Sequence, residues 1–352
     1  MQSQTINAKY FCGIDLHKDN MFICLVDSQN KILVHKRIPA NFPSLSIELG
    51  DYLSDTAIGI ESTFNYYWLQ DACRQNNVQF YLGHALYMRV GVHKKKDDKQ
   101  DSYHIAQLMR NGNFPFSYPF PPVYRGLREL LRSRLKAVRQ RASYYAQFYI
   151  KLLQYNGWSP SVEENPFRDS GKRVRYIRSI SDPGLKLSFQ YLHTQILTLN
   201  SSIELIEKTA LEVTQKLAFQ KLRLLTSVPG IGNILGMTIL VETEDIRRFR
   251  SMQNYSSYCR LVHTQRSSSG KTVDSKNQKS GNVFLKWAYS QAACLAIVHS
   301  PEINALYKKL TKRKGAPKAR AIIRHKLAVA VYQMLKYNIP FDIKLFTKSE
   351  KF

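Results

Sequence analysis

The sequence predicts an α/β domain at the N-terminal end of the chain, followed by two long helices and a mainly α-helical C-terminal domain. Short apolar runs of strand length recur between residues 10 and 82 and alternate with segments at helical spacing, as in an α/β sheet domain. Beyond residue 122, apolar residues recur at helical spacing over much longer stretches. With 352 residues, of which 44% are hydrophobic, the chain can form two or three folded domains.

The first domain is predicted over residues 8–122. Two of its apolar runs end in an acidic residue, the first in Asp15 and the fourth in Glu61. A carboxylate at the end of a buried strand lies at the rim of the sheet, where hard cations and phosphates are commonly bound. Strands are expected at 10–16, 21–27, 31–37, 57–61 and 78–82, and helices at 43–54, 64–76 and 101–111.

Two further acids, Asp98 and Asp101, stand three residues apart at the start of the third of these helices. At this spacing both carboxylates fall on one face of the helix. Four lysines surround them, among them Lys94 and Lys95, and two acids held together in such a setting indicate a cation between them. A capped, solvated helix start is the alternative interpretation.

A stiff, Pro-rich connector at 113–122 marks the end of the first domain. The second region, 123–218, contains two long helices, predicted over 123–154 and 185–215. Their apolar stripes predict a coiled coil, formed either by antiparallel helices or between two molecules. Residues 156–184 between them are expected to form a loop or tip.

The net charge of +26 is unevenly distributed along the chain. Residues 1–122 carry 12 Lys and Arg against 11 Asp and Glu, so nearly all of the excess belongs to the C-terminal two-thirds. This segregation predicts a polyanionic partner such as nucleic acid, with a solubilising surface as the alternative. Arg128 and Arg132 lie on the arginine-rich side of the first long helix, which is consistent either with phosphate contacts or with a solvated face.

The third region, 219–345, begins with a predicted helix-hairpin-helix around Val228-Pro229-Gly230-Ile231-Gly232. Gly230 and Gly232 allow tight turning, so that backbone N–H groups can approach a phosphate closely. A mainly α-helical domain follows, with helices expected at 233–243, 251–261, 283–298 and 319–336.

A polar stretch between two of these helices contains three adjacent serines, Ser267 to Ser269, before a glycine. Arg266 and Lys271 flank them, and cations in these positions would stabilise the charge that develops when a serine attacks a substrate. On composition alone, a flexible loop is the commoner explanation of such a stretch.

The five cysteines are odd in number, widely spaced and without a CxxC pair, so reduced thiols are expected, and neither a disulfide framework nor a zinc ribbon. The sequence shows no signal peptide and no apolar run long enough to span a bilayer. A cytoplasmic protein without a membrane partner is therefore expected.

Together these motifs resemble the DEDD transposases of the IS110 and IS1111 insertion sequences, a group that includes the Piv-type DNA invertase. In the N-terminal half the resemblance rests on Gly13-Ile14-Asp15-Leu16-His17-Lys18, Gly59-Ile60-Glu61-Ser62-Thr63 and Lys96-Asp97-Asp98-Lys99-Gln100-Asp101. In the C-terminal half it rests on Val228-Pro229-Gly230-Ile231-Gly232, Cys259-Arg260-Leu261-Val262, Ser268-Ser269-Gly270-Lys271, Ser280-Gly281-Asn282 and Leu285-Lys286-Trp287-Ala288. The order and spacing of the motifs carry the resemblance over nearly the whole chain.

The resemblance implies a RuvC-like (RNase H-like) N-terminal domain. Its metal site would consist of Asp15, Glu61, Asp98 and Asp101, and its cofactor would be Mg²⁺. The family's essential serine falls on Ser268 when counted from either flanking motif, with Ser269 and then Ser267 as competitors. The family's activity implies that this serine attacks DNA and forms a covalent 5′-phosphoserine. The family also implies a composite site in a dimer or tetramer and a structured guide RNA that pairs with donor and target DNA.

The sequence therefore predicts a DNA transposase or site-specific recombinase that acts on double-stranded DNA. Nucleic-acid contacts are expected at Gly230, Gly232, Lys94, Lys95, Arg128, Arg132, Arg266 and Lys271. The first alternative is a RuvC-like metal-dependent nuclease in which the serine loop is only structural. The second is a catalytically idle protein that binds DNA or RNA, which the complete set of acids argues against.

Overall fold

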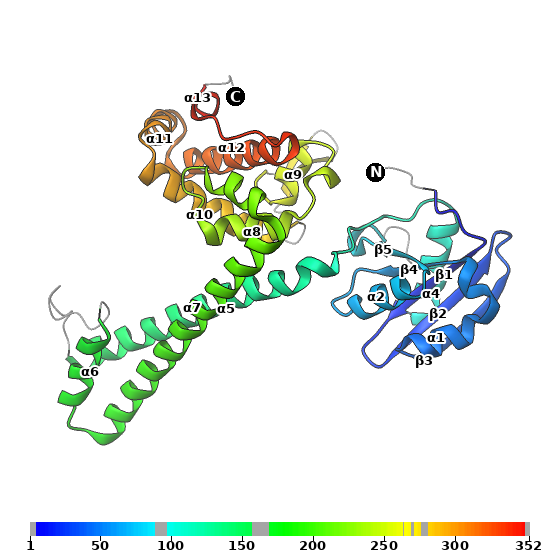
Figure 1. The fold of residues 1–352 in the computed structure, drawn as a ribbon, viewed down its shortest axis with the longest axis horizontal. Coiled ribbons are helices and arrows are strands. Elements are labelled where there is room, and N and C mark those ends of the chain that lie inside the picture. Colours follow the sequence, from blue (N-terminus) through cyan, green and yellow to red (C-terminus); the bar gives the residue numbers. More distant parts are fainter. Residues whose placement is uncertain are drawn as a thin grey trace. The chain divides into compact units, whose positions relative to one another are not determined.

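A computed structural model of the chain describes residues 5–88, 97–156, 169–262, 264–268, 271–275 and 281–348. The chain divides into two compact units, Met1–Pro122 and Val123–Phe352, coloured from blue to cyan and from cyan-green to red in Figure 1. The boundary falls at the end of the Pro-rich segment. Each unit is described here by itself.

Unit 1, Met1–Pro122, is built on a five-stranded mixed sheet with the order β3-β2-β1-β4-β5. The first three strands run antiparallel to one another, whereas β4 and β5 run parallel to β1. All five strands predicted from the apolar runs are confirmed to within two residues. Their bounds are β1 Tyr10–Leu16, β2 Asn20–Asp27, β3 Ile32–Pro39, β4 Thr56–Glu61 and β5 Gln79–Gly83.

Alternating strand residues fill two cores, one on each face of the sheet. Ile14 and Ile23 belong to one core, and Phe11 and Cys24 belong to the other. This is the two-residue period of strands that are covered on both faces. The helices of unit 1 are α1 Phe42–Leu49, the 3₁₀ turn η1 Gly50–Asp55, α2 Tyr67–Gln75, α3 Ala85–Met88 and α4 Asp98–Arg110.

Helix α4 packs unusually close to the sheet because β1 and β4 each carry a glycine beneath it. A Cβ atom on Gly13 would lie 2.1 Å from the carbonyl oxygen of Ser102 and 2.4 Å from the backbone nitrogen of Ala106. A Cβ atom on Gly59 would lie 2.2 Å from the sulfur of Met109. Gly13 therefore lets the backbone of α4 approach β1, and Gly59 leaves room for the Met109 side chain over β4.

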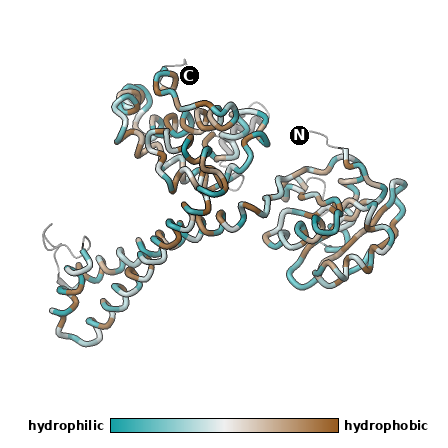
Figure 2. Tube along the Cα trace, in the orientation of Figure 1, coloured by the Kyte–Doolittle hydropathy of each residue, from teal (hydrophilic) through white to brown (hydrophobic). Residues whose placement is uncertain are grey.

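In unit 2, Val123–Phe352, the long helices α5 Pro122–Asn156 and α7 Pro183–Thr226 run antiparallel. Arg134 Nε donates to Glu207 Oε1 at 2.8 Å, and Arg141 Nη1 donates to Asn200 Oδ1 at 2.8 Å, so positions that rise along α5 meet positions that fall along α7. Hydrophobic and hydrophilic segments alternate along both helices in Figure 2, as expected for amphipathic helices. Of the two predicted arrangements, the structure has the antiparallel one.

The segment between these helices was expected to be a loop or tip, but it includes helix α6 Ser170–Ser179. The side chain of Asp169 accepts a hydrogen bond from the backbone N–H of Lys172 and so caps this helix. Ile177 of α6 packs with Phe148 of α5 and Phe189 of α7. The basic composition of the segment gave no apolar pattern from which a helix could be predicted. The helix is stabilised by this small core.

The rest of unit 2 is mainly α-helical, as predicted, and also contains a two-stranded hairpin, β6 Thr264–Ser268 and β7 Lys271–Ser275. The helices predicted at 233–243, 251–261, 283–298 and 319–336 are present, whereas the hairpin and α11 were not predicted. Their bounds are α8 Asn233–Thr243, η2 Ile246–Arg248, α9 Met252–Tyr258, α10 Val283–His299, α11 Pro301–Lys314, α12 Ala316–Tyr337 and α13 Ile343–Thr347. In the described part of the chain, every helix is too short or too polar to cross a membrane.

Candidate active site

Asp15 and Glu61 lie near the carboxyl ends of two neighbouring strands, on the same side of the sheet's rim. Strands β1 and β4 are parallel, and Ile14 is paired with Ile60, so the next residue of each strand is acidic. Parallel strands present their carboxyl ends at one edge of the sheet, where ligands of α/β proteins commonly bind. The Asp15 side chain is 19% exposed, which leaves its carboxylate partly shielded but accessible.

Helix α4 brings a third acid to this edge, and His17 joins the group. The imidazole Nε2 of His17 lies 3.1 Å from Asp15 Oδ2 and 3.3 Å from Asp98 Oδ2. One ligand atom from each of these three residues lies within 4.8 Å of the other two, close enough to share one metal ion. Asp98 lies in the first turn of α4, which Asp97 caps by accepting from the backbone N–H of Lys99.

Glu61 and Asp101 flank this group of three without belonging to it. Glu61 is the last residue of β4, and Asp101 lies three residues beyond Asp98 on α4. Of the four acids expected to hold a metal, the structure thus groups Asp15 and Asp98 directly. It places Glu61 beside Asp15 through the pairing of their strands.

His17 was not predicted as a site residue, although the sequence contained a signal for it. Residues two apart on a strand point to the same side, so Asp15 and His17 share a side, while Leu16 between them is buried in the core. An imidazole at this spacing from a strand-end acid is a reasonable candidate for a ligand or for a proton carrier.

The electrostatics of the site favour a bound cation. Burial raises the pKa of Asp15 above its ordinary value, and the carboxylates of Asp98 and Asp101 raise it further, although the imidazole of His17 opposes the shift. The ionised acids therefore repel one another in the absence of a cation. Carboxylate oxygens are the ligands that hard divalent cations prefer, so this donor set fits such an ion.

The serine stretch forms a hairpin and not an irregular loop. Ser268 is the last residue of β6, and Lys271, the first residue of β7, is its cross-strand partner. Arg266 lies earlier in β6, opposite Val273. Ser269 lies outside the described residues, as do Lys94 and Lys95.

Hydrogen bonds join the chain segments that precede and follow this hairpin, Tyr258 to Arg260 and Gly281 to Asn282, which together are called the hairpin base. The backbone N–H of Asn282 donates to the carbonyl oxygen of Tyr258 at 2.6 Å, and Arg260 Nε donates to the carbonyl oxygen of Gly281 at 2.9 Å. Gly281 has φ +90°, and a Cβ atom there would lie 2.5 Å from the same Tyr258 oxygen. Glycine is required at this position both for its backbone conformation and for the close approach of the two chain segments.

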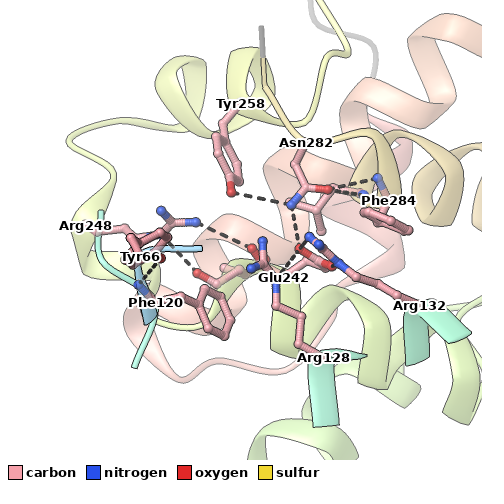
Figure 3. Close-up of polar contacts among 11 residues, drawn as sticks. Tyr66, Phe120, Arg128, Arg132, Glu242, Arg248, Tyr258, Asn282 and Phe284 are labelled. Atoms are coloured by element: carbon pink, nitrogen blue, oxygen red, sulfur yellow. Dashed lines mark hydrogen bonds and ion pairs between the residues drawn. The ribbon is translucent and has the colours of Figure 1, made fainter. Parts of the chain in front are cut away.

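Arg128 and Arg132 point into a buried ion cluster (Figure 3). Their side chains are 16% and 28% exposed, and both donate to the carboxylate of Glu242, whose side chain is 3% exposed. Asn282 Nδ2 donates to the same carboxylate at 2.7 Å. Burial tends to raise the pKa of Glu242, but hydrogen bonds from Arg132 and Asn282 and the charges of both arginines outweigh it, so the pKa is lowered.

The two glycines predicted to contact nucleic acid occupy different environments. Gly230 has φ +85°, and a Cβ atom there would lie 2.4 Å from the carbonyl oxygen of Ala292, so this position serves close packing against α10. Gly232 is exposed and is the N-cap residue of α8, and the N–H groups of the first turn receive no side-chain cap. Of the two glycines, Gly232 is the more exposed.

Acids grouped at the edge of an α/β sheet, in a chain whose second unit is strongly basic, are typical of enzymes that process nucleic acids. Residues 12–156 match a family model for DEDD transposases of the IS110 type, described as "Transposase", and residues 222–308 match one described as "Transposase IS116/IS110/IS902 family". The chain therefore belongs to the IS110 family of transposases.

A curated relative supports this assignment. The chain is 22% identical over 335 residues to the "Transposase for insertion sequence element IS1111A" of Coxiella burnetii, a match that covers 92% of this chain and 88% of the relative. The resemblance seen in the motifs is thus confirmed, and the protein is a DNA transposase. Membership of the DEDD group implies a divalent metal ion at the acid site.

Proposed function

We propose that this transposase cuts and rejoins double-stranded DNA through a covalent serine–DNA intermediate, with Ser268 as the nucleophile and a Mg²⁺-dependent site of RuvC-like (RNase H-like) geometry. The observation that carries the proposal is the grouping of Asp15, His17 and Asp98 at the edge of the mixed sheet. The proposal adds Glu61, at the end of the neighbouring strand, and Asp101, one turn further along α4, to complete the set of four acids. The donor set fits a hard cation bound to phosphate.

The chain's own groups account for strand transfer in two steps. The Ser268 hydroxyl oxygen attacks the phosphorus, a bond forms between that oxygen and phosphorus, and the bond to the 3′ oxygen breaks. The serine's proton ends on the departing 3′ hydroxyl. In the reverse direction a 3′ hydroxyl of another strand attacks the phosphoserine and releases the serine, so no external energy source is needed. Mg²⁺ held by Asp15, Glu61, Asp98 and Asp101 would polarise the phosphate.

The hairpin supports the role of Ser268. Ser268 and Lys271 are cross-strand partners in the β6–β7 ladder, so the proposal assigns Lys271 as the cation nearest to the nucleophile in register. A nearby positive charge would stabilise the phosphate oxygens during attack. The position of Ser268 in the family motif favours it over Ser269 as the nucleophile.

Several partners belong to the proposal. The basic unit 2 would bind donor and target DNA and a structured guide RNA, with Arg266, Lys271 and the exposed turn at Gly232 among the contacts. The turn would act as the hairpin of a helix-hairpin-helix. The acids lie in unit 1 and the serine in unit 2, which is compatible with a site shared between the subunits of a dimer or tetramer. The antiparallel α5–α7 pair is the proposed dimerisation element, and binding to DNA would place the protein at the nucleoid.

The test is a search for a denaturation-resistant protein–DNA adduct. Protein, Mg²⁺, co-expressed RNA and labelled donor and target DNA are incubated and then denatured. We expect an adduct with the wild type and its loss in both Ser268→Ala and Asp15→Asn, while Ser269→Ala retains it. An adduct that persists in Ser268→Ala but is lost in Ser269→Ala would move the nucleophile by one residue.

A metal-dependent nuclease remains the second candidate, because the acids form a site in unit 1 without the hairpin. In that case water attacks the phosphate, and the hairpin is structural. Cleavage without an adduct, unaffected by Ser268→Ala and abolished by Asp15→Asn, would establish the nuclease and refute the serine mechanism.

A further inference from the structure

Glu242 is a buried carboxylate with no role in the proposed chemistry. It is 2% exposed, and its two oxygens accept four hydrogen bonds. Oε1 accepts from Arg132 Nε at 2.7 Å, and Oε2 accepts from Arg128 Nε at 3.1 Å, from Arg132 Nη2 at 3.1 Å and from Asn282 Nδ2 at 2.7 Å. Figure 3 shows these side chains converging from three segments of unit 2.

Asn282 connects this cluster to the base of the serine hairpin. Its side-chain oxygen accepts from the backbone N–H groups of Phe284 and Leu285 and so caps α10. Its side-chain nitrogen donates to Glu242 and, at 3.4 Å, to the Tyr258 hydroxyl, while its backbone N–H donates to the Tyr258 carbonyl oxygen. Every polar group of the Asn282 side chain is thus engaged, and the residue that starts α10 after the hairpin is held in place.

The arginines connect the same cluster to α5. Arg128 and Arg132 lie one turn apart near the start of α5, the helix that follows the connector out of unit 1. The Arg132 guanidinium also lies over the Phe284 ring, with 4.3 Å between its central carbon and the ring centroid. One carboxylate therefore holds together α5, α8, the start of α10 and the hairpin base.

A buried charged cluster is a poor choice for stability alone. Well-packed apolar residues of similar volume are often as stabilising as a buried ion pair, whereas hydrogen-bonded charges fix a unique arrangement of the groups around them. The remainder of α8 is almost wholly apolar and buried, so the helix has an apolar packing surface without Glu242. The cluster is thus better suited to fixing the orientation of the segments around it than to stabilising the fold.

We propose that Glu242 is a positioning residue that fixes the chain segments on either side of the serine hairpin, at Tyr258 and at Gly281 and Asn282, relative to α5. This inference rests on the proposed function, because it treats Ser268 as the nucleophile. Loss of the Glu242–Asn282 contact would then slow attack by Ser268 without weakening the binding of DNA.

Two variants separate this role from a general loss of folding. Glu242→Gln removes the charge, whereas Asn282→Ser keeps a side chain that caps α10 but removes the two donors to Glu242 and Tyr258. Thr243→Val is the matched control, because Thr243 is the next residue of α8, is fully buried, and bonds Tyr255 in the core instead of the hairpin base. All are compared at temperatures well below their measured unfolding midpoints.

The measurement is the rate of adduct formation at saturating donor DNA, together with the DNA concentration that gives half the maximal rate. We expect Glu242→Gln and Asn282→Ser each to lower the maximal rate about 10²-fold, because misplacement of a reacting group by about 1 Å has that effect. The half-saturating DNA concentration should stay within about twofold, and Thr243→Val should react like the wild type.

Each contrary outcome has a distinct meaning. If the wild type forms no adduct, the proposed function falls and this inference falls with it. If the wild type forms the adduct and both variants form it at the same rate, only the inference is overturned. An equal slowing in Thr243→Val, or a loss confined to DNA affinity, would overturn it as well.

Discussion

The close packing of α4 on β1 makes Gly13→Ala the most informative single substitution in unit 1. The added Cβ atom would lie 2.1 Å from the Ser102 carbonyl oxygen and 2.4 Å from the Ala106 nitrogen, whereas ordinary contacts begin at 3.4 Å. Both neighbours are backbone atoms and cannot rotate away. The helix must therefore move outward by about 1.3 Å, the difference between 3.4 and 2.1 Å.

This displacement has two expected consequences. Overpacking of a core by one methyl group costs about 1–3 kcal/mol, which would appear in urea unfolding as a lower midpoint at an unchanged slope. Asp98 moves with α4, away from Asp15 and His17, and a shift of this size at a reacting centre costs about 10²-fold in rate. Metal-dependent adduct formation measures the second effect at a temperature where the variant is folded.

Gly126→Ala is the matched control. Gly126 lies in α5, and a Cβ atom there would meet no atom within 4 Å, so the substitution should stabilise the helix by about 0.5–1 kcal/mol. The reasoning would be refuted if Gly13→Ala unfolded at the wild-type urea concentration and formed adduct at the wild-type rate.

Asp15→Asn should raise the melting temperature of the metal-free protein at neutral pH, because burial and the neighbouring acids raise the pKa of Asp15 and so disfavour its ionised form in the folded state. Added Mg²⁺ should then raise the melting temperature of the wild type and leave that of Asp15→Asn unchanged. The pKa of Glu242 is shifted in the opposite direction, below the ordinary 4.5. Its contribution to stability is therefore present above that pH and is lost as the pH falls through the folded value. Stability measured against pH should therefore fall more steeply below pH 4.5 in the wild type than in Glu242→Gln. A thiol reagent should modify only Cys294 in the native protein and all five cysteines in urea, because the other four are buried.

Contrary results would be equally clear. A lower melting temperature in metal-free Asp15→Asn would show that the folded state does not disfavour the ionised form of Asp15. Parallel pH profiles for the wild type and Glu242→Gln would show that the carboxylate is not held ionised by the arginines. Modification of two or more thiols without urea would show that the cores of the two units open readily.

The strands and the acids they carry were predictable because one physical pattern specifies both. Buried strands appear as short apolar runs, and an acid that ends such a run must lie at the sheet edge, as Asp15 and Glu61 do. The contact between Asp98 and His17 was harder to predict. It depends on the close packing of α4 on the sheet, which Gly13 and Gly59 allow. A glycine in a strand indicates close approach of another segment, but does not indicate which segment approaches.

The Glu242 cluster shows why part of unit 2 could not be predicted. Two arginines four residues apart on a basic helix were interpreted through their charge, whereas the structure pairs both with a carboxylate more than a hundred residues away. The sequence did contain one sign of this pairing, since Glu242 is the one charged residue of α8, a helix that is otherwise mostly apolar. Its partners are set by tertiary packing, which periodicity does not encode.

The closed base of the serine hairpin also determines how changes in the length of the hairpin segment affect the rest of unit 2. Because the segment enters at Tyr258 and leaves at Asn282, and these residues are hydrogen-bonded to each other, the ends of the segment stay together whatever lies between them. Lengthening such a closed segment adds only a small entropic cost and leaves the helices below undisturbed. The segment between Tyr258 and Asn282 can thus accept insertions without disturbance of the helices to which it is attached.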